Sequence, residues 1–196
     1  MDNLPLVIAS SNKGKVKEFE KLLEGFPFDL LNQPLCIEIE ETGKTFMENA
    51  RIKAFAVSKE TGNLSLADDS GLSVEALGGA PGIYSSRYAS SDKKRIEKLL
   101  DELKPFSNRK AKFECALCIA SREKVLIEVQ GFCEGEITSF PKGNNGFGYD
   151  PIFEVSGLGE TYAEMNSNKK KHIGHRGNAF KLLKPELQKL LSLLEK

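Results

Sequence analysis

The stretch PLVIASSNKGKVKEFEKLLEGF, residues 5–26, sets the fold class of this chain. It begins with a short, nearly continuous apolar run, which is typical of a strand buried on both faces. Apolar residues then recur at helical spacing over residues 15–26, so this part is predicted to form an amphipathic helix with Gly25 near its end. A buried strand followed at once by an amphipathic helix is the repeating unit of an α/β fold.

The same alternation of strands and helices continues along the first part of the chain. Strands are predicted over residues 36–40 (CIEIE) and residues 64–68 (LSLAD). Between them, Thr45 and Glu48 match a capping box, which predicts a helix that runs to Gly62. This order favours a sheet whose strands are joined by helices.

The second half of the chain adds a different pattern. Residues 92–104 repeat the amphipathic helix spacing. Residues 111–121 and 124–137 are two long β segments with a short link, which predicts an antiparallel hairpin. Residues 177–196 are predicted to be helical, with Pro185 at a break or in the first turn of a second helix. Together the two halves predict an α/β domain with a mixed sheet.

Composition narrows the classes of protein that fit. The chain has 196 residues, of which 40% are apolar and 29% charged, so we expect one soluble domain over residues 1–196. Lys plus Arg equals Asp plus Glu at 28 each, so no global field recruits a nucleic-acid polymer, although a local cluster could still bind a small anion. The first twelve residues match neither a signal peptide nor a membrane span. A cytoplasmic protein that does not bind membranes is therefore expected.

The cysteines support a reducing compartment. There are four, too few and in settings too apolar for a disulfide scaffold. Cys115 and Cys118 form a CxxC on a predicted strand, where the two thiols would point to opposite faces. With no second CxxC to complete a zinc site, they are interpreted as core cysteines, and a thiol redox module is a remote alternative.

Pairs of carboxylates end two of the predicted strands, Asp68 and Asp69 in one and Glu40 and Glu41 in the other. Buried paired acids cost desolvation free energy unless a positive group compensates them. If the two strand ends lie side by side, the carboxylates suit Mg²⁺, which takes one or two carboxylates plus substrate phosphates. Adjacent strand residues face opposite ways, so at most one acid of each pair need meet the metal. The alternative is that the acids complement a helix dipole.

Two loops carry groups that could bind an anion. SSNKGK, residues 10–15, lies between the first strand and the first helix, where backbone N–H groups and lysines can hold phosphate. It is not a Walker sequence, and an ordinary polar turn is the alternative. Residues 168–180 contain the densest cationic run of the chain, whose His and Arg side chains can donate hydrogen bonds to phosphate or keto oxygens. A solvated basic loop is the alternative there.

A glycine-rich loop offers aromatic rings. Residues 141–153 contain three glycines and two asparagines, and Phe147 and Tyr149 stand between glycines or beside them. Rings presented on such a loop can stack on a flat ligand such as a nucleobase. A turn with two packed aromatic side chains is the alternative.

Taken in order, these stretches resemble one known family. The sequence contains SSNKGK, EETGKTFMENARIKA, ADDSGL, GGAPGIYSSRYA, GFGYDPIF and HRGNAFKLL, and with them it resembles the inosine triphosphate pyrophosphatase family over residues 7–190. The resemblance implies an elongated α/β fold with a central mixed sheet, flanking helices and a cleft between two lobes. It also implies a homodimer that depends on Mg²⁺ and hydrolyses ITP, dITP and XTP to the monophosphate and pyrophosphate.

The resemblance also implies roles for residues at matching positions. The triphosphate would be held by Ser10, Ser11, Asn12, Lys13, Gly14 and Lys15. Mg²⁺ would be placed by Glu40 or Glu41 together with Asp69, which is also the expected general base. The nucleotide would contact Ser70, Phe147, Gly148, Tyr149 and Asp150, and the base and phosphate pocket would be completed by Lys170, His175 and Arg176. Two positions depart from the family pattern, since Gly174 replaces the usual Ser and Ser10 replaces a common Thr.

The residue types suggest how such an enzyme would work. Asp69 would orient or deprotonate a water that attacks the α-phosphorus, while Mg²⁺ offsets the phosphate charge. Donors near His175 and Arg176 would favour the 6-keto oxygen of hypoxanthine or xanthine over the amino group of adenine. The alternatives are a Maf-type pyrophosphatase of modified pyrimidine nucleotides and a nucleotide-binding protein without catalysis.

Overall fold

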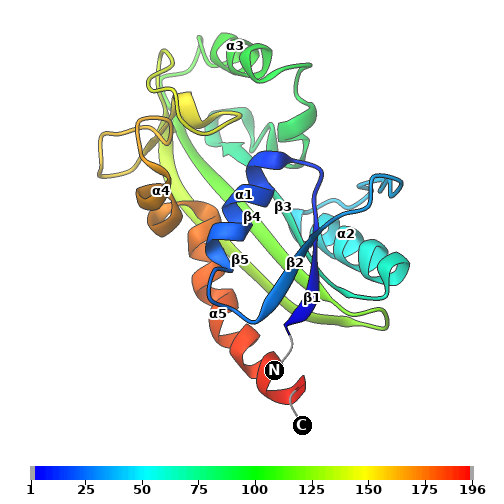
Figure 1. Ribbon diagram of the computed structural model, residues 1–196. Helices are drawn as coiled ribbons and strands as arrows, with labels where there is room; N and C mark the ends of the chain where they lie inside the picture. Colours follow the sequence, from blue (N-terminus) through cyan, green and yellow to red (C-terminus); the bar gives the residue numbers. More distant parts are fainter. Residues whose placement is uncertain (1–2, 195–196) are drawn as a thin grey trace. The chain divides into compact units, whose positions relative to one another are not determined.

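The computed structural model describes residues 3–194 (Figure 1). The strands are β1 (Leu4–Ala9), β2 (Phe28–Asn32), β3 (Leu64–Val74), β4 (Lys110–Ala120), β5 (Val125–Ile137) and β6 (Phe153–Val155). The α-helices are α1 (Lys13–Leu22), α2 (Phe46–Thr61), α3 (Asp92–Glu102), α4 (Ser167–Ile173) and α5 (His175–Leu194). Three short 3₁₀ helices are η1 (Glu75–Leu77), η2 (Gly82–Arg87) and η3 (Asp150–Ile152). Within this described part of the chain, no helix is long and apolar enough to span a membrane.

One mixed sheet contains all six strands, in the order β2-β1-β3-β4-β5-β6. β1 runs parallel to β2 and to β3, with Ala9 opposite Ala67 in the second pair. A short turn joins β4 to its neighbour β5, which makes that pair an antiparallel hairpin, and β6 pairs antiparallel with β5. The predicted α/β fold class, a mixed sheet flanked by helices, is therefore confirmed.

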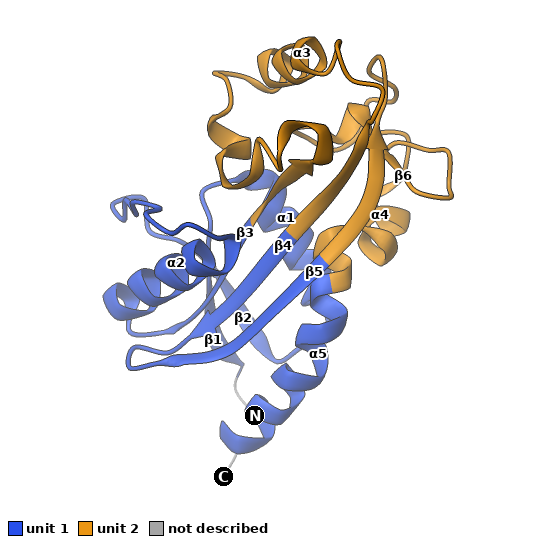
Figure 2. Cartoon of the chain, turned by 180° about the vertical axis from the view of Figure 1, so that it is seen from behind, with its two compact units in different colours: residues 1–69, 115–131, 179–196 blue, residues 70–114, 132–178 orange. Residues whose placement is uncertain are grey.

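The chain divides into two compact units (Figure 2). Unit 1 comprises the residues up to 69, residues 115–131 and the residues from 179 onward. Unit 2 comprises residues 70–114 and 132–178. Three strands, β3, β4 and β5, each contribute residues to both units. The prediction of a single domain with a cleft between two lobes remains a prediction.

Unit 1 has its own hydrophobic core. Phe19 and Leu22 of α1 and Leu183 of α5 pack with alternate residues of the strands, among them Leu6 and Ile8 of β1. These side chains are at most 6% exposed, which removes most of their apolar surface from water and stabilises the unit. The helix α2 also contacts β1, and Ala50, Ala54 and Val57 are among its buried residues.

Unit 2 has a second, separate core. Leu99 of α3, Leu103 directly after that helix and Phe153 of β6 are fully buried in it. Phe113 stacks against the ring of Tyr162 with the ring centroids 5.5 Å apart. The glycine-rich segment contributes Tyr149 and Ile152 to this core.

The capping signals in the sequence predict the ends of α2 well. The hydroxyl of Thr45 accepts the N–H of Glu48 at 3.1 Å, and the carboxylate of Glu48 accepts the N–H of Lys44 at 2.6 Å. At the other end Gly62 is in the left-handed conformation, with φ of 75°, which favours glycine. The predicted helix and its boundaries are confirmed.

Several sequence-based expectations are wrong in detail. Residues 36–40 form no strand. The edge strand beside β1 is instead β2, a short segment that the sequence pattern did not single out. The strand predicted to end at the acids runs on to Val74, so Asp68 and Asp69 lie inside β3. The final helix does not break at Pro185, which lies within the continuous helix α5. Alternation alone misled the first prediction, because a strand also needs a partner.

Candidate active site

The two adjacent aspartates of β3 serve opposite faces of the strand. Asp68 is 2% exposed and its carboxylate forms an ion pair of 2.9 Å with Lys15 of α1. Asp69 is 5% exposed and turns instead toward α2, where it meets Asn49 and Lys53. This is the alternation that a strand imposes on consecutive residues. Each acid therefore has its own cation, and the two are not equivalent.

Asp69 belongs to a set of four residues of unit 1, Glu41, Asn49, Lys53 and Asp69, which we call the acid–lysine cluster. The Lys53 ammonium lies 2.7 Å from the Glu41 carboxylate and 3.1 Å from one oxygen of Asp69. The other oxygen of Asp69 accepts the amide N–H of Asn49 at 3.1 Å. Asn49 is itself held, because its side-chain oxygen accepts the N–H of Gly43 at 2.8 Å. The cluster therefore fixes the direction of the Asp69 carboxylate from both sides.

Burial and charge shift the titration of this cluster. Burial raises the pKa of the Asp69 carboxyl above its usual range, although Lys53 and Lys15 partly oppose that shift. For Lys53, burial alone would lower the pKa of the ammonium, but the surrounding carboxylates outweigh burial and the pKa is raised. A carboxylate with a raised pKa that faces a charged lysine is suited to accept a proton.

The acids predicted to bind a metal are only partly brought together. Glu41 and Asp69 converge on one cation, Lys53, whereas Glu40 is exposed in an irregular segment. Among the described residues, no group of three or more acidic, His or Cys side chains could hold a metal. Two convergent carboxylates nevertheless fit the donor set of Mg²⁺, which keeps several waters and shares its coordination with substrate phosphates.

The predicted phosphate loop lies at the N-terminus of α1. Asn12 is the N-cap, and its side-chain oxygen accepts the N–H groups of Gly14 at 2.8 Å and Lys15 at 3.2 Å. The hydroxyl of Ser10 accepts the N–H of Asn12 at 3.2 Å. The loop side chains that reach solvent are those of Ser11, Asn12 and Lys13. Lys13 is thus an exposed cation at the positive end of a helix dipole, while Lys15 is committed to Asp68.

Unit 2 gathers the residues predicted to bind the base. The buried carboxylate of Asp150 pairs with the Lys170 ammonium at 2.7 Å and accepts the N–H of Phe147 at 2.9 Å. The Phe147 ring has Lys170 at 5.0 Å and the Arg176 guanidinium at 5.6 Å from its centroid, both within cation–π range. An aromatic ring next to two cations can hold a flat, electron-rich ligand.

The histidine of this group is fixed from two directions. His175 is 3% exposed and stacks on Phe113 at 4.7 Å between ring centroids. Its backbone N–H donates to the hydroxyl of Tyr162 at 3.2 Å. Arg176 donates to the Ser70 hydroxyl at 2.6 Å, which brings Ser70 to the same group. We call the set Phe113, Phe147, Asp150, Tyr162, Lys170, His175 and Arg176 the aromatic–basic cluster.

Three other positions behave differently from the side chains of this cluster. Tyr149 is 3% exposed, and its hydroxyl donates to the Ser85 carbonyl at 3.0 Å, so its ring is part of the core and is not presented on the loop. Gly148 contributes only its backbone. Gly174, where a Ser is expected from the resemblance, approaches the Lys170 carbonyl so closely that an added Cβ would lie 2.7 Å from that oxygen. The chain here is packed for a glycine.

Sequence reasoning did not assign roles to several residues that the structure brings to these clusters. Asn49 and Lys53 are four residues apart, so they lie on one face of α2 and reach Asp69 together. That spacing is visible in the sequence and places both on one face of the helix, but it does not show that this face meets Asp69. Phe113 and Tyr162 gave no comparable signal, because a buried aromatic side chain in a strand or loop is usually a core residue.

Comparisons with known proteins identify relatives of the whole chain. A protein-family profile described as the Ham1 family matches residues 6–186. A protein of Prochlorococcus marinus strain NATL1A, named dITP/XTP pyrophosphatase, is 83% identical over the whole length of both chains. The structure of a HAM1 protein from Coxiella burnetii has a TM-score of 0.87 and 42% identity, covering 95% of this chain and 99% of that one. The Ham1 protein of Staphylococcus aureus has a TM-score of 0.84 and 42% identity, covering 94% and 98%.

Proposed function

This chain belongs to the Ham1 family, and from that premise we propose that it cleanses the cellular nucleotide pool of aberrant purine nucleotides. It is a nucleoside triphosphate pyrophosphatase that hydrolyses ITP, dITP and XTP to the nucleoside monophosphate and pyrophosphate. The single observation that carries the chemistry is the buried Asp69 carboxylate, held between Asn49 and Lys53 and with a raised pKa. Such a group is suited to act as a general base.

The reaction is a displacement at the α-phosphorus. Asp69 orients a water and accepts its proton as the water oxygen forms a bond to the α-phosphorus. The bond from that phosphorus to the oxygen bridging to the β-phosphate breaks, and pyrophosphate leaves with the bonding electrons. Positioning and electrostatic stabilisation supply most of the rate enhancement in phosphoryl chemistry, and Lys53 provides positive charge beside the base.

Cations of unit 1 provide the complement to the triphosphate. Lys13 is exposed at the N-terminus of α1, where the helix dipole also favours an anion. Lys15 forms an ion pair with Asp68, which orients the lysine toward β3. We assign the triphosphate to this segment, residues 10–15.

Mg²⁺ is the proposed cofactor, and Glu41 and Asp69 would hold it. When bound, the ion offsets charge on the phosphates and stabilises the leaving pyrophosphate. Glu41 is favoured over Glu40 because its carboxylate faces Asp69 across Lys53, whereas Glu40 is exposed. The ammonium of Lys53 shows that the two carboxylates can share one cation.

The aromatic–basic cluster is the proposed base pocket. The Phe147 ring offers a stacking surface, and Lys170, His175 and Arg176 offer hydrogen-bond donors. The 6-keto oxygen of hypoxanthine or xanthine accepts such bonds, whereas the amino group of adenine is itself a donor. An unpaired donor in a partly dry pocket costs on the order of several kcal/mol, which would disfavour ATP. Tyr149 would not contact the base. Its buried ring would instead stabilise the core of unit 2 beside this pocket.

A homodimer in the cytoplasm is the proposed state of the enzyme. The proposal rests on the family resemblance and on the composition of the chain. Size-exclusion chromatography with light scattering at several protein concentrations tests it. A monomer mass at every concentration would contradict the dimer.

Incubation with a panel of nucleoside triphosphates tests the function. The purified protein with Mg²⁺ is expected to release monophosphate and pyrophosphate from ITP, dITP and XTP, and to act far more slowly on ATP and on pyrimidine nucleotides. Asp69→Asn is the matched inactive control. Release of orthophosphate, preference for a modified pyrimidine nucleotide, or tight binding of ITP without turnover would each contradict the assignment.

A further inference from the structure

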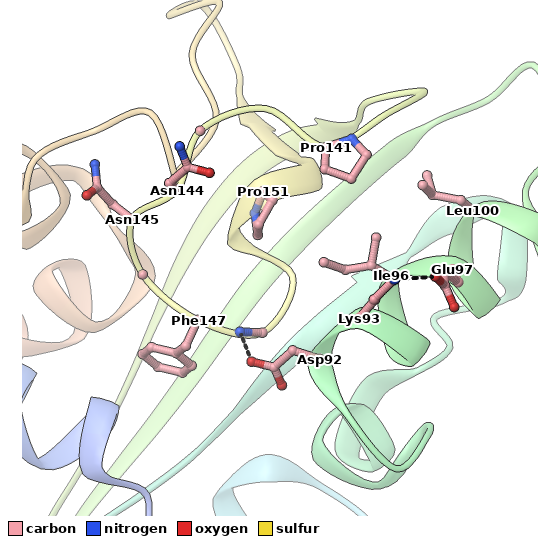
Figure 3. A pocket seen from close by; sticks show the side chains of 13 residues that line it. Asp92, Lys93, Ile96, Glu97, Leu100, Pro141, Asn144, Asn145, Phe147 and Pro151 are labelled. Atoms are coloured by element: carbon pink, nitrogen blue, oxygen red, sulfur yellow. Dashed lines mark hydrogen bonds and ion pairs between the residues drawn. The ribbon is translucent and has the colours of Figure 1, made fainter.

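The glycine-rich loop of unit 2 lies beside an open pocket. A pocket of about 550 Å³ separates the loop of residues 141–148 from α3 (Figure 3). Ile96 and Leu100 line it from the helix, and Pro141 and Pro151 from the loop side. The loop is therefore not closely packed against the helix, since space remains between them.

Hydrogen bonds, and not packing against α3, hold the loop in position. At its start, the N–H groups of Asn144 and Asn145 donate to the Ala163 carbonyl at 3.2 and 3.0 Å. At its far end, two successive backbone N–H groups donate to carboxylates: Phe147 to Asp150 at 2.9 Å and Gly148 to Asp92 at 2.8 Å. The peptide that carries the Phe147 ring is thus held between two acids.

The two acids differ in their setting. Asp150 is 2% exposed and belongs to the aromatic–basic cluster. Asp92 comes from α3, and its side chain is 48% exposed at the rim of the pocket. Its second oxygen pairs with the Arg95 guanidinium at 2.9 Å, which orients the carboxylate toward Gly148. Figure 3 draws the hydrogen bond between the Gly148 N–H and Asp92 as a dashed line that joins the loop to the helix.

The helix that carries Asp92 is itself firmly anchored. Leu99 and Leu103 are fully buried in the core of unit 2. Ser91 caps the helix by accepting the N–H of Lys94 at 3.3 Å. Asp92 therefore presents a fixed acceptor to the loop, in which Gly146 and Gly148 both adopt positive φ, a conformation that favours glycine.

We propose that Asp92 is a positioning residue for the purine base: its hydrogen bond to Gly148 holds the Phe147 ring in the stacking orientation. The inference rests on the proposed function and deepens it, because it places a specificity determinant on α3, outside the base pocket. Without the bond, the loop can relax into the adjoining pocket, and the ring loses its fixed place beside Lys170 and Arg176. Binding of the base weakens, while binding of the phosphates does not.

Inhibition by the two products separates these effects. With dITP as substrate, Asp92→Ala is expected to raise KM and the inhibition constant of dIMP about five- to tenfold, the net value of one partly exposed hydrogen bond. The inhibition constant of pyrophosphate, which has no base, stays within about twofold of the wild type. Equal weakening of both products, or of neither, would overturn the proposal.

Two control variants exclude a merely structural role. Asp92→Asn keeps an oxygen that can accept the Gly148 N–H and is expected to restore dIMP inhibition to within about twofold of the wild type. Lys93→Ala changes the next residue of α3, which lines the same pocket but has an 87% exposed side chain, and it leaves KM unchanged. An asparagine variant as weak as the alanine variant would contradict the proposal.

A double-mutant cycle makes the link to Phe147 explicit. In a Phe147→Ala background there is no ring to position, so Asp92→Ala is expected to cause no further change in dIMP inhibition. Fully additive effects would overturn the inference. If Asp92→Ala does not fold by circular dichroism, Asp92→Ser, whose side chain is one bond shorter, replaces it in the cycle. A wild-type protein that releases no pyrophosphate from dITP would sink the proposed function and this inference with it, whereas an active wild type matched by its alanine variant would sink only the inference.

Discussion

The acid–lysine cluster and the aromatic–basic cluster are built from different interactions. In the acid–lysine cluster of unit 1, buried charges face one another: Lys53 lies within 3.1 Å of two carboxylates, and burial raises the pKa of Asp69. In the aromatic–basic cluster of unit 2, aromatic rings stack, and the ring centroids of Phe113 and His175 are 4.7 Å apart. The Lys170 ammonium lies over the face of the Phe147 ring. The first arrangement suits proton transfer and phosphate charge, and the second suits a flat, neutral base.

Because the two clusters differ in this way, we expect substitutions in them to change different kinetic parameters. Substitutions in the acid–lysine cluster should lower kcat, because they remove groups that act only on the reacting phosphate. Substitutions in the aromatic–basic cluster should raise KM and blur the choice of base, because they remove binding that does not change during the reaction.

The largest effect is expected from Asp69→Asn. The amide keeps the size of the side chain but cannot accept the proton of the attacking water, so kcat should fall about 10²–10⁴-fold while KM for dITP changes little. Asp68→Asn is the matched control, since Asp68 faces Lys15 on the opposite side of β3, and its loss of kcat should be at least tenfold smaller. Pyrophosphate release and circular dichroism measure both variants. Equal losses in the two would break the division.

A smaller effect, on KM, is expected from Phe147→Ala. Loss of stacking on a base costs about 1–3 kcal/mol, which corresponds to a rise in KM for dITP of about 5- to 150-fold with a much smaller change in kcat. Phe147→Tyr keeps a ring and should behave like the wild type. Steady-state kinetics with dITP and dATP measure the change in both affinity and base preference. A variant that loses kcat and keeps KM would contradict the role of the ring.

Gly177→Ala is expected to affect stability in unit 2. An added Cβ would lie 1.8 Å from the Lys171 carbonyl, a backbone atom that has no freedom to move aside. The free energy of unfolding should fall by about 1–3 kcal/mol, as for other overpacking substitutions. Gln188→Ala, at an exposed position of α5, is the neutral control. Denaturant unfolding measures both, and an unchanged midpoint for Gly177→Ala would mean that α4 and α5 can separate at this point.

The smallest effect concerns the reactivity of the cysteine thiols, since each unit contains a buried thiol. Burial raises the pKa of Cys118 in unit 1 to about 12 and also raises that of Cys133 in unit 2. At pH 8 the thiolate fraction of Cys118 is then about 10⁻⁴, whereas Cys36 is exposed and free to react. An aromatic disulfide reagent whose released thiolate absorbs visible light should detect one rapidly reacting thiol in the native protein and none in Cys36→Ser. Fast reaction of a second thiol would mean that one of the two cores opens readily.

The sequence predicts the helices better than the strands. The capping box at Thr45 and the apolar spacing in α1 and α3 depend on local contacts, so they can be recognised in a single segment. The strands β2 and β6 are short, and what makes them strands is a neighbour: β2 pairs with β1 and β6 with β5. Pairing between distant segments leaves no mark in the segment itself.

The same limit applies to the candidate site. The alternation of a strand predicted that Asp68 and Asp69 face opposite ways, and the structure confirms it. The sequence did not predict that a lysine, Lys53, lies between Glu41 and Asp69, because that contact joins α2, β3 and an irregular segment. Nor did it predict that the Tyr149 ring belongs to the core, because its partner, the Ser85 carbonyl, is 64 residues away.

The most direct test of the account is to follow the oxygen of water during the reaction. Asp69 is proposed to direct a water to the α-phosphorus, so hydrolysis of dITP in ¹⁸O-labelled water should place the label in dIMP and leave the released pyrophosphate unlabelled. Mass spectrometry of the two products reads this result in one experiment. Label in the pyrophosphate would mean that water attacks the β-phosphorus, and it would contradict the mechanism assigned to the acid–lysine cluster.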